Sequence, residues 1–226
     1  MRGRHVRLPP ARPGQPNPAQ NKVYANAHPG RALRQRIVEQ VEEILWKYKL
    51  APATLRLPAS PGIDEIQVFS IAQRVPELRE DVLRTLDRAI PSLLFFELTF
   101  QGRIRFAAAY KRMSEAAHDK QFVAAYYVSP WQDTSALREA LPVAIDIGSL
   151  YEQMLRRHML ASGLGLRPRP NETLEQTAER GSQIRTQMLA CQRLEATLKR
   201  EAQFNRKVEI NATLRQARAA LEELQQ

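Results

Sequence analysis

One stretch of the chain, SLLFFELTFQGRIRFAAAYKR at residues 92–112, restricts the fold more than any other. Apolar residues alternate along both of its halves: Leu94, Phe96, Leu98 and Phe100, then Ile104, Phe106, Ala108 and Tyr110. Alternation with a period of two is the pattern of a strand with one apolar face. The Gln101-Gly102 pair between the halves is typical of a tight turn. The sequence therefore predicts a β-hairpin here.

Helical and strand-like patterns surround this hairpin. Apolar residues at three- and four-residue steps predict helices over Pro29–Lys49, from Pro76 to Ile90, and over residues 146–161. Strand-like runs occur at Leu55–Leu57, at residues 63–75, where both faces carry apolar side chains, and at residues 121–131. This order predicts an α+β fold, in which a small mixed or antiparallel sheet has flanking helices and precedes a helical region. The last helix is expected to be long, amphipathic and coiled-coil-like.

Proline, glycine and charge suggest where the chain divides. We expect a basic, Pro-rich, disordered arm at residues 1–28, an α+β domain with trailing helices at 29–161, and a linker at 162–170. Residues 171–226 would form a long C-terminal helix or a helical hairpin. Asn171 can cap its start, and Thr173 with Gln176 resembles a capping box.

The basic charge is concentrated in the arm. The net charge is +10, but residues 1–36 hold eight basic side chains and no acid, which leaves 26 basic against 24 acidic residues elsewhere. An arm of this kind can contact nucleic-acid phosphates, and a solubilising tail or an over-extended start are the alternatives. Candidate nucleic-acid contacts lie in the arm and at the end of the hairpin: Arg2, Arg4, Arg7, Arg12, Lys111 and Arg112.

Several classes of site have no sequence signal. Cys191 is the single cysteine and the four histidines are isolated, so neither a disulfide nor a zinc cluster is predicted. No glycine-rich phosphate loop follows a strand, and no cofactor is expected. No apolar run is long enough for a membrane span. Because the single cysteine cannot form an internal disulfide, the expected location is the reducing cytoplasm.

One catalytic alternative is a metal-dependent nuclease. Its acids would hold a divalent ion and its lysine would stabilise the attacked phosphate. The candidates are Asp64, Glu65, Glu97 and Lys111. Glu97-Leu98-Thr99 lacks the lysine two positions on that restriction-type nucleases show. Glu97 also alternates with the apolar residues of its strand, so we expect it on a solvated sheet face.

The C-terminal region carries two apolar stripes that are offset near residues 202–210. They must pack on the domain, on a second copy or on another protein. The candidate partner interface is Leu194, Leu198, Phe204, Asn205, Val208, Ile210, Leu214 and Leu221. A buried Asn205 would fix register, and Phe204 would pack on the domain body. The alternative is an exposed face that tolerates both Asn205 and Asn211.

Four segments carry a resemblance to a known family: LKREAQFNRKVEIN, EEILWKYKLAPATLRLP, LDRAIPSLLFFELTFQGRI and AAAYKR. Together they resemble the domain of unknown function 4391 family of bacteria and archaea, in order from about Lys22 to the C-terminus. The Pro-rich extension lies outside the family pattern. Members resemble genomic neighbours of restriction–modification components, especially helicases and DNA methyltransferases. The resemblance carries over no catalytic residue.

The function expected from these features is that of a non-enzymatic accessory subunit of a restriction–modification or anti-phage system, docking a helicase or DNA methyltransferase. The C-terminal helix could also form a homo-oligomer, and the arm could add DNA affinity. A metal-dependent nuclease and a stand-alone nucleic-acid-binding module are the alternatives.

Overall fold

The computed structural model describes residues 26–113, 121–135 and 140–226. These residues form two compact units. The first ends at His158 and the second comprises Met159–Gln226.

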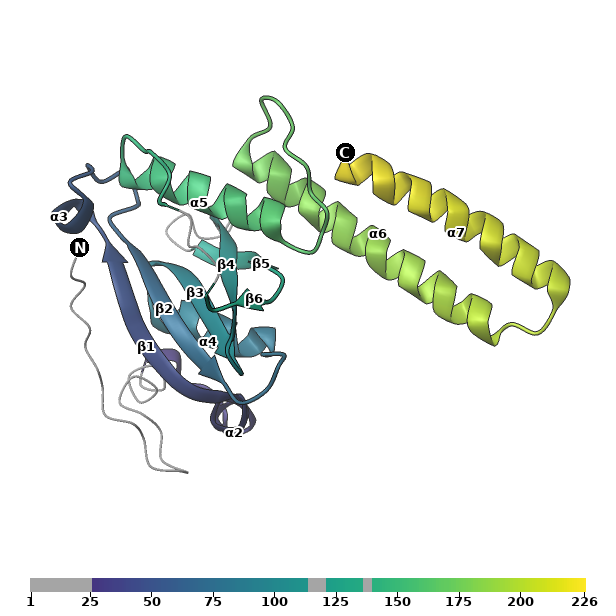
Figure 1. The fold of residues 1–226 in the computed structure, drawn as a ribbon, viewed down its shortest axis with the longest axis horizontal. Coiled ribbons are helices and arrows are strands. Elements are labelled where there is room, and N and C mark those ends of the chain that lie inside the picture. Colours follow the sequence, from purple (N-terminus) through teal and green to yellow (C-terminus); the bar gives the residue numbers. More distant parts are fainter. Residues whose placement is uncertain (1–25, 114–120, 136–139) are drawn as a thin grey trace. The chain divides into compact units, whose positions relative to one another are not determined.

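The first unit is built on one mixed sheet (Figure 1). Its strands are β1 (Val41–Leu50), β2 (Ile66–Gln73), β3 (Leu93–Phe100), β4 (Arg103–Met113), β5 (Gln121–Val128) and the short β6 (Gln132–Asp133). The order is β1-β2-β3-β4-β5, and β6 pairs with β4. β2 and β3 are parallel and are connected through helix α4 (Glu80–Ala89), whereas the other pairs are antiparallel. The predicted α+β class is therefore confirmed.

Helices cover both faces of this sheet. Ile37 of α2 (Arg31–Gln40) and Val82 and Leu86 of α4 join the core that Phe96 and Leu98 form on one face. On the other face lies α5 (Ile147–Ala161). The Tyr151 ring of α5 makes an edge-on contact with Phe95 at 6.0 Å, and its hydroxyl donates to the Ala109 carbonyl at 3.2 Å. Because adjacent strand residues point to opposite faces, Phe95 and Phe96 are buried on different sides.

The β3–β4 hairpin is confirmed, and its turn explains the Gln-Gly pair. Gln101 has φ of 46° and Gly102 has φ of 75°. Two consecutive positive φ angles are the conformation of the turn that matches the twist of a two-residue hairpin. Glycine adopts this conformation without steric cost, whereas Gln101 adopts it against its preference.

The predicted helix over Pro29–Lys49 is wrong in its second half. The helix α2 ends at Gln40, and Val41 begins β1. Register shifts between Val41 and Glu43 and between Trp46 and Tyr48 interrupt the pairing of β1 with β2. A bulge adds a residue to one strand, so the buried Val41 and Ile44 lie three positions apart. That spacing imitates a helical stripe.

Other predicted elements differ in their bounds. The expected strand at Leu55–Leu57 is absent, because Pro52–Leu55 forms the short helix α3. The strand predicted at residues 63–75 is β2, which carries buried residues of both parities. The helix predicted from Pro76 begins four residues later, at Glu80.

The second unit contains a helical hairpin rather than one long helix. Helix α6 (Leu174–Arg200) and helix α7 (Phe204–Gln225) run side by side in opposite directions (Figure 1). The Thr173 hydroxyl accepts from the Gln176 N–H, and the Gln176 side chain accepts from the Thr173 N–H. Thr173 therefore caps α6, and the prediction that Asn171 does so is wrong. Between the helices, the Glu201 carboxylate accepts hydrogen bonds from the N–H groups of Ala202 and Gln203, each at 2.9 Å.

Candidate functional site

The four residues of the nuclease alternative do not share one site. Asp64 is exposed at the start of the segment that leads into β2. Glu65 pairs with Lys49, Glu97 with Lys47, and Lys111 with Asp87. Each buried or half-buried acid thus has its own lysine. Within the described ranges, no group of three or more His, Cys, Asp or Glu side chains is placed to hold a metal ion.

Glu97 occupies a different environment from the solvated face that its sequence pattern predicts. It is buried in β3 and forms an ion pair with Lys47 of β1, across β2. The error arises because both faces of the sheet are covered, so strand alternation no longer separates core from solvent.

Glu65 and Lys111 are connected through one residue, Ser92. The Ser92 hydroxyl donates to Glu65 at 2.8 Å and accepts from the Gln67 amide at 3.0 Å, while its carbonyl accepts from Lys111 at 3.1 Å. The Lys49 ammonium and the other donors around it lower the pKa of the Glu65 carboxyl. This network joins the amino-terminal ends of β2 and β3.

A second polar cluster comprises Asp87, Lys111 and Tyr126. The Lys111 Nζ lies 3.0 Å from Asp87 Oδ1, the Tyr126 hydroxyl donates to the other carboxylate oxygen, and both members of the ion pair are buried. Burial raises the pKa of Asp87, which the Lys111 charge and the Tyr126 hydroxyl oppose. Burial and the neighbouring Asp87 also raise the pKa of Tyr126.

Sequence reasoning missed Asp87 and Tyr126. Asp87 directly follows Leu86 of the apolar stripe, where an acid is typical of a helix surface. A signal did exist, since Lys111 directly follows the apolar and aromatic run Phe106–Tyr110 and would need an acidic partner if buried.

The nucleic-acid candidates separate into three environments. Arg2, Arg4, Arg7 and Arg12 lie outside the described residues. Lys111 is buried in its ion pair, so the expected surface contact to phosphate is wrong for this residue. Arg112 is exposed.

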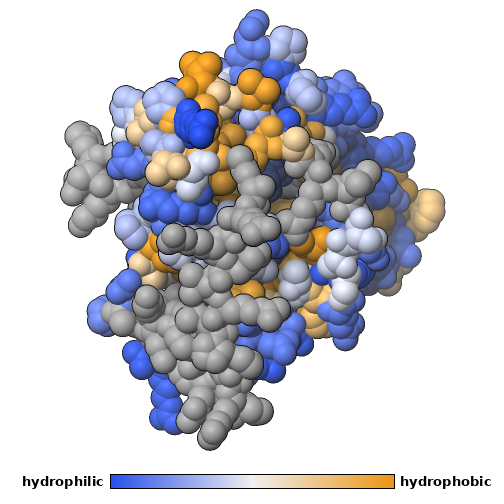
Figure 2. Space-filling model, turned by 60° about the vertical axis from the view of Figure 1, so that its left-hand side comes forward, coloured by the Kyte–Doolittle hydropathy of each residue, from blue (hydrophilic) through white to orange (hydrophobic). Residues whose placement is uncertain are grey.

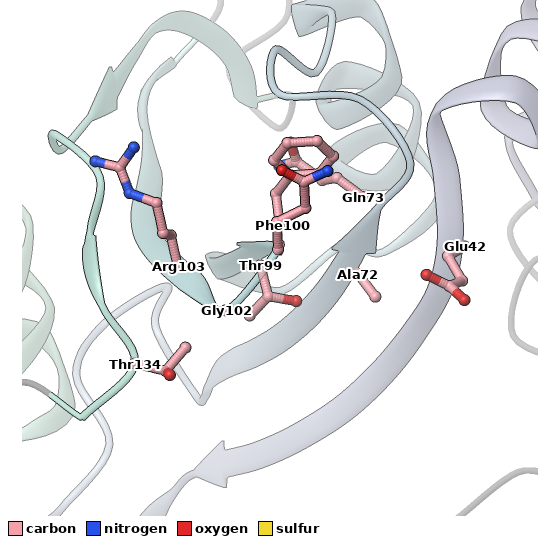
Figure 3. Close-up of a pocket in the computed structure, with 9 residues that line it drawn as sticks. Glu42, Ala72, Gln73, Thr99, Phe100, Gly102, Arg103 and Thr134 are labelled. Atoms are coloured by element: carbon pink, nitrogen blue, oxygen red, sulfur yellow. The ribbon is translucent and has the colours of Figure 1, made fainter.

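A shallow pocket lies at the carboxyl ends of the parallel strands β2 and β3 (Figure 3). Its volume is about 140 Å³, and its lining includes Glu42, Gln73, Thr99, Phe100 and Arg103. Because Ala72 and Thr99 are paired, the next residues, Gln73 and Phe100, direct their side chains to the opposite sheet face. The Gln73 amide therefore does not face the same side of the pocket as the Thr99 hydroxyl.

Most of the predicted partner interface is used inside the helical hairpin. Leu214 is buried, and Leu194, Leu198, Ile210 and Leu221 are half-buried. Between the helices, the Gln187 amide donates to the Ala217 carbonyl at 2.9 Å, and Arg218 pairs with Glu195. The two offset stripes belong to two antiparallel helices, which explains the change of seam near residues 202–210.

The three remaining interface candidates lie at the turn of this hairpin and point to solvent. Phe204, the first residue of α7, is 78% exposed, and Val208 one turn later is also exposed. Asn205 is exposed as well. The expected packing of Phe204 on the domain body and the expected burial of Asn205 are therefore both wrong.

A second exposed apolar segment precedes α5. Val143 is 94% exposed and Ile145 81%, and Leu141 is exposed on the same parity. The Gln153 and Arg157 side chains of α5 donate to the carbonyls of Val143 and Ala140, at 2.9 and 3.1 Å. These bonds hold the backbone of the segment to α5 while its apolar side chains meet water.

Comparison with known families shows to which family the chain belongs. The family model described as Domain of unknown function (DUF4391) matches residues 9–221. The chain belongs to this family. The match begins at residue 9, so the expectation that the Pro-rich extension lies outside the family pattern is wrong for most of that extension. No curated protein and no solved structure matched the chain. Among the residues that the structure describes, no helix is both long enough and apolar enough to cross a bilayer.

Proposed function

We propose that this DUF4391 protein is a non-enzymatic accessory subunit of a prokaryotic DNA-processing system of the restriction–modification or anti-phage type. In this role it docks a helicase or a DNA methyltransferase. The observation that supports docking is the exposed apolar segment of Leu141, Val143 and Ile145. The choice of partner follows from the genomic neighbours that the family resemblance implies.

Solvent exposure of this segment is costly for the isolated chain. Contiguous apolar residues on a surface typically mark a site of interaction, and Figure 2 shows apolar residues gathered in patches on one face of the molecule. Leu141, Val143 and Ile145 have the same parity, so in an extended backbone their side chains follow one another about 7 Å apart on one side. An apolar groove on a partner would accommodate them as a row.

The segment is also held in position before any partner binds. Gln153 and Arg157 contact its backbone, and the Asp146 carboxylate accepts from the Ser149 N–H at 2.7 Å at the start of α5. Preorganisation lowers the conformational entropy that is lost on binding. Pro142 has no N–H group, so recognition would rest on side chains rather than on a continuous β-ladder.

The test is a pull-down of the full chain from its native operon, in which a helicase and a DNA methyltransferase are sought among the retained proteins. We expect one of them to be retained, and Val143→Asp/Ile145→Asp to abolish retention because a charge in an apolar groove is unfavourable. Leu189→Asp, at another exposed apolar position, is the matched control and should retain the partner. Retention of neither enzyme by the unaltered chain would overturn the proposal.

A further inference from the structure

We propose that the turn of the α6–α7 hairpin binds single-stranded nucleic acid directly, with Phe204 stacking on an unpaired base and the surrounding cations contacting phosphates. We call this surface the hairpin tip and define it as residues 199–208. The inference does not rest on docking of a partner, because it concerns the chain alone.

The hairpin tip is strongly basic. Lys199, Arg200, Arg206 and Lys207 lie on its ten residues, and Glu201 is its only acid. The Glu201 carboxylate is turned toward the loop backbone, where the Gln203 and Ala202 N–H groups lower its pKa. It therefore does not form an ion pair with a tip cation within the part of the chain that is described.

Arg206 is the tip cation with a carboxylate partner, Glu209, which lies just outside the tip at 3.3 Å. Both side chains are largely exposed. Exposed pairs of this kind contribute little and are readily exchanged for another anion. The positive charge of Arg206 thus stays available to a phosphate.

Phe204 is the second component of the proposed binding surface, beside the cations. The residue is 78% exposed at the first position of α7, between Arg200 and Lys207 in the sequence. Aromatic rings set among basic side chains are the combination with which proteins bind single strands, because every base presents a flat face for stacking. The cations neutralise the backbone on either side.

The size of the exposed apolar area at the hairpin tip distinguishes nucleic acid from an acidic protein as its ligand. A stable protein interface buries about 800 Å² on each partner and has an apolar centre. At the hairpin tip the exposed large apolar side chains are Phe204 and Val208. That area is small for a protein interface but sufficient for one base, so the observations favour a nucleic-acid strand.

The experiment measures binding of the full chain to a fluorescein-labelled single-stranded DNA by anisotropy, between 50 and about 200 mM salt. Phe204→Ala should weaken binding about 10-fold, while Phe204→Trp should retain it. Lys199→Gln/Lys207→Gln should reduce the slope of log K against log salt by about 1.4, at about 0.7 for each phosphate contact. Arg88→Gln/Arg215→Gln removes the same charge from exposed positions outside the tip and should change little.

Two further experiments distinguish binding at the hairpin tip from binding by the basic arm and from recognition of an acidic protein. Deletion of residues 1–20 should leave most of the binding and its dependence on Phe204. If that deletion abolishes binding while Phe204→Ala does not, the arm is the contact and the proposal is overturned. Binding of labelled poly-glutamate with equal affinity and equal sensitivity to Phe204→Ala would also overturn it, in favour of an acidic protein. Circular dichroism of each variant confirms that the helices are retained.

Discussion

Arg180 of α6 binds Glu172 in the preceding loop through two parallel contacts, Nε to Oε1 at 2.7 Å and Nη2 to Oε2 at 2.6 Å. The same guanidinium donates to the carbonyl of Arg167 at 2.8 Å and to that of Leu224 at 3.0 Å. One buried side chain therefore joins the loop before α6, the helix α6 itself and the end of α7. It closes the open end of the helical hairpin.

Replacement of Arg180 should destabilise the second unit. Arg180→Met leaves a largely buried carboxylate without its charged partner and removes the Arg180 donors from two carbonyls, and we expect a loss of about 3 kcal/mol. Arg180→Lys should lose somewhat less, because an ammonium keeps the charge but not the planar fork. Urea unfolding followed by circular dichroism measures both. Equal stability of all three proteins would contradict the assigned role.

The same pair predicts a dependence on pH. The hydrogen bonds and charge of Arg180 hold the pKa of Glu172 below its ordinary value of 4.5. Because the unfolded state then binds the proton more readily, the pair stabilises the fold above pH 4.5 and this contribution is lost as the pH falls through the lower, folded value.

Glu172→Gln isolates this effect from that of other acids, such as Glu65. We expect urea midpoints of the unaltered chain to fall between pH 5 and pH 3 more steeply than those of the variant. Parallel curves for the two proteins would show that Glu172 does not titrate differently on unfolding.

The buried Asp87–Lys111 pair should show strong coupling. Asp87→Asn or Lys111→Met alone leaves one buried charge without its partner, and each should cost about 3 to 5 kcal/mol. Asp87→Leu/Lys111→Met removes both charges and should be less destabilised than either single variant. Additive losses in thermal unfolding would contradict a structural ion pair.

Gln73 offers a substitution that should stabilise the protein. It is 4% exposed, and neither its amide nitrogen nor its amide oxygen has a hydrogen-bond partner among the described residues. An unsatisfied buried polar group costs about 1 to 3 kcal/mol. Gln73→Leu should therefore raise the melting temperature by about 2 °C or more. A lower melting temperature would indicate that the amide is satisfied in solution, for example by water.

Some features of this protein followed from short-range sequence patterns. The β3–β4 hairpin was predictable because alternation and a Gln-Gly turn are local properties of Leu94–Ile104. The helix α4 and the Thr173–Gln176 capping box were predictable for the same reason. The α+β class followed from the order of these elements, which left a mixed and an antiparallel sheet open, and the family followed from four sequence segments.

Other features were decided by contacts between residues distant in the sequence. The bulges of β1 exist only in its pairing with β2, and they gave Val41 and Ile44 a helical spacing. Glu97 is buried because α5 and Lys47 cover a face that alternation alone assigns to solvent. Asp87 and Lys111, 24 positions apart, were joined by packing of α4 against the sheet.

The C-terminal region shows most directly which features depend on local sequence and which depend on tertiary contacts. Its sequence predicted two offset apolar stripes, on either one long helix or a helical hairpin. Only the tertiary structure decided that α7 folds back on α6, because the chain reverses at residues 201–203 and each stripe then covers the other. That reversal buries Leu214 and leaves Phe204 at the turn, exposed among cations. Burial depends on which surfaces meet, and that information lies in the packing rather than in local pattern.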